Sequence, residues 1–438
     1  MQRLPQEKNI FKLRGNSKCP ICPVCGGIQP YLLIEKHVNF CLDLSSNVKD
    51  TLCDVVTKNE ESFSSNLLSP KKRLSFFNGR KYSAINKVRK SRESSVFDGV
   101  PTHKIIEGTF FMVDAFNYGI RPECRGYFLT HFHSDHYNGI SNLWVNSNSP
   151  IYASNLTCLL LKEFFGINAK ALLIGEEYTI DGIVVQVYDA NHCPGSLMIS
   201  FTLPNNNCIL HTGDFRASYE LVNKINKVHW DTIYLDNTYA SSTSNFMTQD
   251  DAISGAVCKL KKLVSQKKLC TSGDYLIIIG TYKIGKERLA IECAKSFKTT
   301  IFSSPKKLRV YSLMHEWADF QSLLSKDAIS YKIHLVDMSI VDNYLDYWLQ
   351  YKDHFKMGCI AINPTGWVGN VSIRHSGSCT YLRIPYSEHS SYSELLNFIQ
   401  ALKPGKIIPT VGPLCGYEIE SHNAVEILSV CSKERVLN

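Results

Sequence analysis

The sequence predicts an α/β fold in which a second α/β unit is inserted into the first. Three observations support this prediction. The length of 438 residues is enough for two or three domains. Short runs of β-branched and aromatic residues begin near residue 100, and turn residues separate several of them. From about residue 245 to 360, longer helix-like segments alternate with such runs, which is typical of a separate α/β unit.

The expected elements follow one another along the chain. Strands of the first unit are predicted at 110–113, 126–130, 183–188, 197–202, 208–211 and 232–235. Strands at 275–279 and 359–362 belong to the insertion, and strands at 380–384 and 406–409 flank a helix at 393–402. We therefore expect residues 100–243 to form the first part of the main domain. Residues 244–370 would be inserted, and residues 371–438 would return to the main domain.

Residues 1–99 form a basic leader. The first 100 residues hold 17 Lys and Arg against 9 Asp and Glu, whereas the rest of the chain holds 31 of each. We interpret 1–18 as a flexible tail, 19–43 as a Cys/His cluster and 44–99 as a disordered basic linker. The KKR sequence at 71–73 fits either a nuclear-targeting patch or a solvated linker. The basic charge of the whole leader fits a polyanionic partner. We expect a nuclear protein.

Composition excludes several classes of protein. Hydrophobic residues are 44% and charged residues 20% of the chain, as in ordinary soluble globular proteins. No apolar run reaches the ~18–20 residues of a membrane-spanning helix, and 1–18 has no apolar signal core. We therefore expect no membrane association. Twelve of the 16 cysteines lie outside 19–43, without pairing spacings, and fit reduced thiols.

The strongest chemical signal is HFHSDH at 131–136, directly after a predicted strand. Four ligand-type side chains within six residues would be costly to bury unless they bind an ion. Imidazole and carboxylate suit zinc and similar ions. His131 and His133 alternate along an extended chain and can point at one ion, whereas Asp135 and His136 turn toward a second. A polar surface loop is the alternative interpretation.

Two later motifs supply what this loop lacks. His192 follows an apolar strand within DANHCPG at 189–195, and Asp214 follows another within HTGDFR at 211–216. A single His or Asp at a strand end is usually structural. Together, the three motifs have the order and chemistry of a two-metal hydrolase.

These motifs resemble the metal motifs of the metallo-β-lactamase fold, and Asp114 in FFMVDAF resembles its first motif. LDNTY at 235–239 and PYSEHSS at 385–391 are similar to the additional motifs of its β-CASP nuclease branch. IGTYKIGKE at 279–287 and NPTGW at 363–367 resemble the DNA interstrand cross-link repair nucleases, relatives of Artemis and Apollo. The resemblance runs from about 105 to 415 and is weakest from 300 to 355.

The resemblance implies a four-layer αβ/βα sandwich with an inserted β-CASP domain and two catalytic Zn²⁺ ions. The implied ligands of the first zinc are His131, His133, His192 and Asp214. Those of the second are Asp135, His136, His389 and a bridging Asp214. Asp114 would orient the HFHSDH loop from behind, and Asp236 would support the histidines of that loop. The implied catalytic residues are Asp135, His136, Asp214, Asp236 and His389.

The resemblance also bears on the substrate. RNA-processing β-CASP members usually carry His at the third of the family's motifs, and DNA-acting members carry an apolar residue. Val411 stands at that position, which favours DNA. The best-matched relatives trim DNA from a 5′-phosphorylated end, whereas Artemis-like members cut hairpins and overhangs. A water molecule between two zinc ions would attack the phosphodiester, so no separate protein base is required.

Five residues near these motifs are candidates for substrate binding, each with a structural alternative. Ser387 and Ser390 precede a predicted helix, where serines bind anions or cap the helix. Lys283 and Lys286 lie between a strand and a helix, and would bind substrate phosphates or remain solvated. Tyr239 would stack on a base or ribose, or pack in the core.

The Cys/His cluster has the spacing of a zinc finger that binds one Zn²⁺. Its expected ligands are Cys22, Cys25, His37 and Cys41, with Cys19 as an alternative. The spacing resembles a ubiquitin-binding finger of DNA-repair proteins, which implies ubiquitin or ubiquitylated repair proteins as partners. A structural or nucleic-acid-binding finger is the alternative. The apolar residues in LSFF at 74–77 would dock on a sliding clamp, although their spacing differs from the usual clamp motif.

We thus expect a zinc-dependent 5′→3′ DNA exonuclease that acts in interstrand cross-link repair. The alternatives are a structure-specific DNA endonuclease, an RNA-processing nuclease and a non-catalytic adaptor that binds ubiquitin and DNA. The intact set of seven metal-binding side chains argues against the adaptor.

Overall fold

The computed structural model describes residues 87–90 and 97–433, except 146, 242, 244, 267–274, 331, 413 and 422. The predicted tail, most of the predicted linker and residues 71–77 lie outside the described residues. So do the expected finger ligands Cys22, Cys25, His37 and Cys41. The described residues belong to one compact unit.

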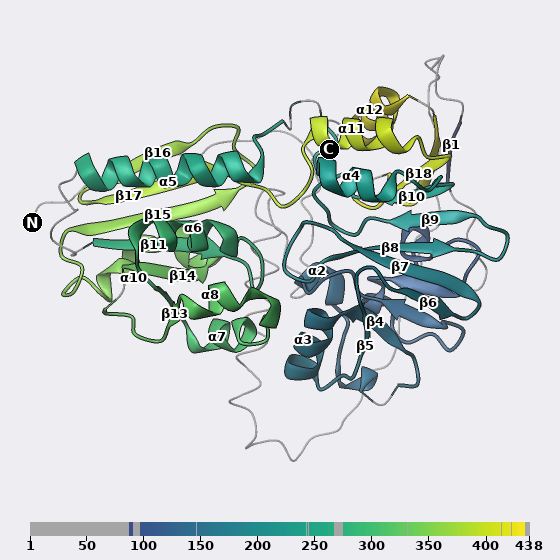
Figure 1. The fold of residues 1–438 in the computed structure, drawn as a ribbon, viewed down its shortest axis with the longest axis horizontal. Coiled ribbons are helices and arrows are strands. Elements are labelled where there is room, and N and C mark those ends of the chain that lie inside the picture. The colour runs from purple at the N-terminus through teal and green to yellow at the C-terminus, as the bar shows by residue number, and fades with distance from the viewer. Residues whose placement is uncertain are drawn as a thin grey trace, which may run out of the picture. The chain divides into compact units, whose positions relative to one another are not determined.

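Two sheets build the main part of this unit (Figure 1). The smaller is wholly parallel, in the order β2 (Phe111–Val113), β3 (Gly126–Phe128), β4 (Ile151–Ser154) and β5 (Lys170–Leu172). The larger is mixed, in the order β1 (Lys87–Lys90), β19 (Tyr417–Glu420), β18 (Lys406–Pro409), β10 (Thr232–Leu235), β9 (Cys208–His211), β8 (Leu197–Thr202), β7 (Ile183–Asp189) and β6 (Glu177–Ile180).

The two sheets pack face to face, with one helical layer outside each. Phe111 and Phe128 from the small sheet share a buried core with Ile199 and Phe201 from the large one. Helix α3 (Asn155–Phe165) covers the outer face of the small sheet. The outer face of the large sheet packs on α4 (Tyr219–Ile225), α11 (Tyr392–Leu402) and α12 (Ala424–Lys433). This layering confirms the predicted αβ/βα sandwich.

A third sheet supports the inserted part. Its order is β13 (Leu324–Ser325), β12 (Ile301–Ser303), β14 (Ile333–Asp337), β11 (Tyr275–Thr281), β15 (Gly358–Thr365), β17 (Cys379–Pro385) and β16 (Ser372–Ser376). One face packs on α5 (Gln249–Gln266), α6 (Glu287–Phe297), α7 (Pro305–Tyr311) and α8 (Ala318–Ser322). The other packs on α9 (Met338–Asp342) and α10 (Tyr344–Leu349). Buried strands such as β11, YLIIIGT, are apolar in nearly every position, as parallel strands covered on both faces require.

The structure differs from two expected boundaries. The inserted sheet continues past residue 370, because β16 and β17 form a hairpin whose second strand pairs with β15. We therefore propose that the insertion ends near Pro385. Within the expected disordered linker, β1 is a strand that pairs antiparallel with β19, which supplies a free edge for it. No helix in the described part of the chain is long and apolar enough to cross a membrane.

Candidate metal centre

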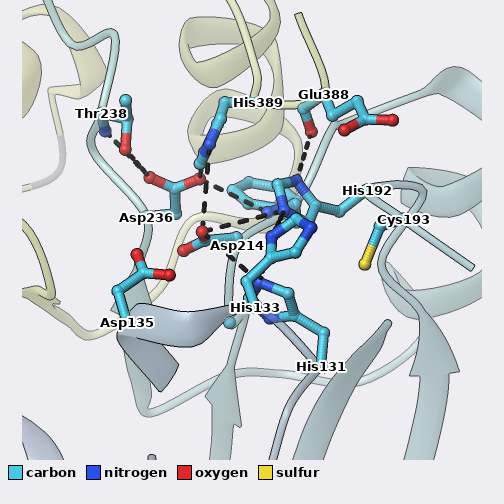
Figure 2. Close-up of polar contacts among 12 residues, drawn as sticks. His131, His133, Asp135, His192, Cys193, Asp214, Asp236, Thr238, Glu388 and His389 are labelled. Atoms are coloured by element: carbon cyan, nitrogen blue, oxygen red, sulfur yellow. Dashed lines mark hydrogen bonds and ion pairs between the residues drawn. The ribbon is translucent and has the colours of Figure 1, made fainter. Parts of the chain in front are cut away.

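The residues of the metal motifs lie just after the carboxyl ends of strands, where the chain turns. His131 and His133 follow β3, and Asp135 and His136 lie in the short helix α2 (Ser134–Tyr137). The remaining candidates and the strands they follow are Asp114 (β2), His192 (β7), Asp214 (β9), Asp236 (β10) and His389 (β17). Six segments that are distant in the sequence therefore meet at one site (Figure 2).

The Asp214 carboxylate is the centre of this cluster. Its Oδ2 atom lies 3.2 Å from His136 Nε2, 3.8 Å from His131 Nε2, and 3.9 Å from the Nε2 atoms of His192 and His389. His133 Nδ1 lies 2.9 Å from His131 Nε2 and 3.2 Å from His192 Nε2. Two nitrogen ligands about 2.0–2.1 Å from one tetrahedral zinc ion lie about 3.3 Å apart. The spacing of these atoms fits metal binding.

Three histidines are anchored through the ring nitrogen that faces away from the cluster. Thr130 Oγ1 lies 3.0 Å from His131 Nδ1. The carbonyl oxygen of Ile284 lies 2.9 Å from His133 Nε2, and that of Glu388 lies 2.9 Å from His192 Nδ1. A carbonyl only accepts, so the ring nitrogen that faces it donates. The other nitrogen of that ring then presents a lone pair, which is what a metal ligand requires.

Carboxylates anchor the other two histidines. Asp114 Oδ2 accepts a hydrogen bond from His136 Nδ1 at 2.7 Å, and Asp236 Oδ2 accepts one from His389 Nδ1 at 2.7 Å. Asp236 is held in turn by Thr238, whose backbone NH and hydroxyl both donate to Oδ1, at 2.9 and 2.6 Å. Both aspartates are buried; Asp114 contacts the loop histidine His136, whereas Asp236 contacts His389 and not, as expected, a histidine of the 131–136 loop.

The charges of the cluster suit a cation. Burial lowers the pKa of His131 and of His192 well below the usual value, so both rings are neutral. Burial alone would raise the pKa of Asp214, but His136 and His389 hold it well below its ordinary range. Burial alone would lower the pKa of His136, yet the surrounding carboxylates, Asp214 above all, raise it well above the ordinary value. The neutral rings of His131 and His192 beside an ionised Asp214 suit a divalent metal, and metal binding would displace the proton that His136 carries.

Among the described residues, three groups of side chains have potential metal-ligand atoms within 4.8 Å of one another. They are His131, His133, His192 and Cys193; His131, His136 and Asp214; and His192, Asp214 and His389. Asp135 belongs to none of them, because its side chain is 76% exposed, although its Oδ2 lies 3.6 Å from His136 Nε2. Cys193 was not anticipated as a neighbour of these ligand atoms. Its position directly after His192 was the available signal.

The structure favours supporting roles for the serines expected to bind substrate. Ser390 is buried, and its hydroxyl donates to the carbonyl of Phe215 and accepts from the backbone NH of Ala217. Ser387 is also buried, and its hydroxyl accepts from the backbone NH of His389. Both serines therefore fix the loop that carries His389.

The other three substrate candidates also have internal contacts. Lys286 is buried, and its Nζ atom donates to the carbonyl of Pro364 at 2.7 Å. The Lys283 ammonium lies over three aromatic rings, the nearest being Phe164 at 4.0 Å from the ring centroid. Tyr239 is 6% exposed and packs with its ring centroid 6.1 Å from that of His389. These contacts favour core packing for Tyr239. They also favour a structural role for Lys283 and Lys286, which neither project into solvent nor are placed to bind a phosphate by these contacts.

Comparisons with known proteins agree with this geometry. Residues 318–414 match the family model described as DNA repair metallo-beta-lactamase. The DNA cross-link repair protein SNM1 of Arabidopsis thaliana is 39% identical over 71% of this chain and 66% of its own length. The DNA cross-link repair protein pso2/snm1 of Schizosaccharomyces pombe is 33% identical over 90% of this chain and 75% of its own length. The 5′ exonuclease Apollo of Danio rerio is 30% identical over 72% of this chain. The chain spans about two thirds of the plant protein and about half of the zebrafish protein.

Proposed function

The chain belongs to the DNA cross-link repair family of metallo-β-lactamase proteins, and from this premise we propose that it is a zinc-dependent 5′→3′ exonuclease that hydrolyses DNA from a 5′-phosphorylated end in interstrand cross-link repair. One observation carries the proposal. Five histidines surround the Asp214 cluster, and each has its outward ring nitrogen anchored by another group.

The proposed ligands are those implied by the sequence. His131, His133, His192 and Asp214 would hold one zinc, and Asp135, His136, His389 and Asp214 the other. The donor set fits because it is rich in imidazole, combined with carboxylates held in the ionised state. When bound, two such ions lower the pKa of a water molecule toward neutrality and neutralise charge on the phosphate.

The chain's own residues prepare this site before any substrate arrives. Asp114 and Asp236 fix the rings of His136 and His389, so neither ring has to reorient during the reaction. Asp135 is the exposed member of the set and lies where solvent and a substrate phosphate have access. No other general base is required in this proposal, because metal ions held by these ligands would lower the pKa of the attacking water toward neutrality.

Support for DNA over RNA comes from the position where RNA-processing relatives carry His. Val411 occupies it, and its backbone NH and carbonyl are both bound by the side-chain amide of Asn237, at 3.0 and 2.9 Å. Asn237 thus pins the Val411 backbone in place. We further propose a nuclear location, supported by the basic leader, and ubiquitin binding by the finger at 19–43. A sliding-clamp contact at 74–77 is a weaker proposal.

The test is cleavage of 3′-labelled single-stranded DNA with a 5′-phosphate or a 5′-hydroxyl end. We expect products that shorten stepwise from the 5′-phosphate end, and Asp135→Asn should slow this reaction by about 100-fold or more. Asp319→Asn is the matched control, because Asp319 is also an exposed aspartate in the first turn of a short helix. Equal rates for wild type and Asp135→Asn would refute the assigned metal chemistry. Absence of cleavage would favour RNA, hairpin DNA or an adaptor role.

A further inference from the structure

We propose that Trp367 is a platform on which a nucleobase of the DNA strand stacks beside the metal centre. The proposal rests on the proposed nuclease function and adds the residue that positions the strand. It differs from the expectation for Tyr239, which is buried and offers no free ring face of comparable size.

Exposure sets Trp367 apart from the other tryptophans. The chain has five, and Trp367 is 63% exposed, whereas Trp144 and Trp230 are buried and Trp317 and Trp348 are half-buried. An indole buries a large apolar area when covered, so leaving it in water is unfavourable. An exposed indole next to a candidate site is available to stack on a ligand.

A short chain of aromatic contacts links Trp367 to the metal centre. Its ring centroid lies 5.4 Å from that of Tyr239, and the Tyr239 centroid lies 6.1 Å from that of His389. Only one aromatic ring therefore separates the exposed indole from a proposed ligand. A DNA strand whose phosphate reaches Asp214 would have a neighbouring nucleotide within reach of this indole.

The loop that carries Trp367 passes very close to Tyr239 and Ser387. A Cβ atom on Gly366 would lie 2.3 Å from the Tyr239 hydroxyl and 3.0 Å from Ser387 Cβ, so only glycine lets the chain pass here. The backbone NH of Trp367 donates to Thr365 Oγ1 at 3.3 Å. The buried Lys286 ammonium binds the Pro364 carbonyl at 2.7 Å and so fixes the strand end before the loop.

Tyr239 is itself immobilised beneath this loop. Its ring packs edge-on against Phe246, with the centroids 5.0 Å apart. The platform thus has a rigid base and one exposed indole. A nucleobase is the ligand that fits, because every base has a π-face and stacking tolerates sequence. An exonuclease that removes nucleotides one after another must accept each base in turn, which stacking allows and edge-reading hydrogen bonds do not.

The first experiment compares Trp367→Ala and Trp367→Phe with wild type on 5′-phosphorylated single-stranded DNA. We expect Trp367→Ala to raise KM by about 5- to 100-fold, the loss associated with one stacked base, with kcat nearly unchanged. Trp367→Phe keeps an aromatic face and should recover most of this loss. Tyr219→Ala is the control, because Tyr219 is a 78% exposed aromatic residue at the start of helix α4 and has no assigned role. Loss of kcat with unchanged KM would overturn the proposal.

The second experiment locates the stacked base. Substrates with an abasic site at the first, second or third position from the 5′ end are tested with wild type and Trp367→Ala. At the stacked position the abasic site should raise KM for the wild type but not further for the variant, because the two changes remove the same contact. Independent effects at every position would overturn stacking while leaving the nuclease function intact.

The third measurement separates failure of this inference from failure of the proposed function. Full-length protein treated with EDTA is titrated with DNA that carries 2-aminopurine at the position found above, or at each of the first three positions. Stacking on the indole should quench the 2-aminopurine fluorescence, and Trp367→Ala should abolish this quenching. Quenching without cleavage by the metal-loaded protein would support the platform and refute the nuclease function. Cleavage with equal quenching in both proteins would refute the platform alone.

Discussion

Each histidine of the metal centre can act as a ligand in only one tautomer, and the group behind it selects that tautomer. The carboxylates do this most strongly, because a charged acceptor makes a stronger hydrogen bond than a neutral carbonyl. Asp114 also binds Thr130: its two carboxylate oxygens accept hydrogen bonds from the backbone NH and the hydroxyl of Thr130, at 2.9 and 2.8 Å. It therefore connects His136 to the loop that carries His131.

Replacing Asp114 with Asn tests this selection. Asn tolerates the left-handed backbone of Asp114 (φ 49°), so the fold should persist. An amide NH₂ facing His136 Nδ1 would force that nitrogen to accept and would place the proton on Nε2, the proposed ligand atom. We expect zinc affinity at one of the two sites to fall by about 10- to 100-fold, measured by competition with a chelator.

Asp181→Asn is the matched control for this change. Asp181 is also an aspartate with φ 49°, but it lies exposed in the turn between β6 and β7. Its substitution should leave both zinc affinities unchanged. Equal affinities for wild type and Asp114→Asn would show that Asp114 does not set the tautomer of His136.

At the scale of elements, the loop between β11 and α6 joins the inserted sheet to the metal centre. Lys283 lies over the rings of Phe132 and Tyr137, on either side of His133 in the sequence. The Ile284 carbonyl anchors His133, and the backbone NH of Lys286 donates to Glu388 Oε1 at 2.6 Å. The inserted part thus contributes to the geometry of the ligands without supplying one.

Gly285 determines how closely this loop approaches. It has φ +106°, and a Cβ atom there would lie 2.8 Å from Glu388 Oε2. We expect Gly285→Ala to lower the free energy of unfolding by more than the ~1–2 kcal/mol of backbone strain and to weaken zinc binding through His133. Gly175→Ala is the control, since Gly175 has φ +88° and open space around its Cβ position. Equal destabilisation in denaturant titrations would exclude a role for the close approach.

The elements also show which features local sequence could predict. Strands such as β8 and β18 were predicted with the bounds that the structure has, because their apolar runs end at turn residues. The HFHSDH ligands could be recognised because they are adjacent in the sequence. The carbonyls of Ile284 and Glu388 could not, because a backbone oxygen carries no side-chain signal and its partner lies 151 or 196 residues away. Ser390 was named as an anion-binding or helix-capping residue, but local sequence could not predict that its hydroxyl bonds to the backbone of Phe215 and Ala217, 175 and 173 residues away.

At the scale of the whole molecule, folding buries ionisable groups beside the metal centre. Glu287 is fully buried at the start of α6, and burial raises its pKa to about 7. Both its oxygens accept from the backbone NH of Gly285. Burial likewise raises the pKa of Glu388 to about 8. These carboxyls make the stability of the whole unit depend on pH.

The sign of this dependence follows from proton binding. In the unfolded chain the Glu287 carboxyl loses its proton near pH 4.5, whereas in the folded protein it does so near pH 7. Between these values the folded state binds more protons. The free energy of unfolding therefore falls as pH rises through this window, and the loss is complete above pH 7. Glu287 thus destabilises the folded protein most at alkaline pH.

Glu287→Gln should remove this fall, because an amide stays neutral and one oxygen still accepts from Gly285. Relative to wild type, we expect the variant to gain up to roughly 3 kcal/mol in free energy of unfolding between pH 5 and pH 8, measured by denaturant titration at each pH. Glu292→Gln on the same helix is the control, since Glu292 is a surface residue paired with Lys295 and its removal should change stability little at any pH. If the free energies of unfolding of wild type and Glu287→Gln change in parallel with pH, Glu287 is already ionised in the folded protein at pH 5. The Gly285 NH and the nearby Lys307 charge would then offset the effect of its burial.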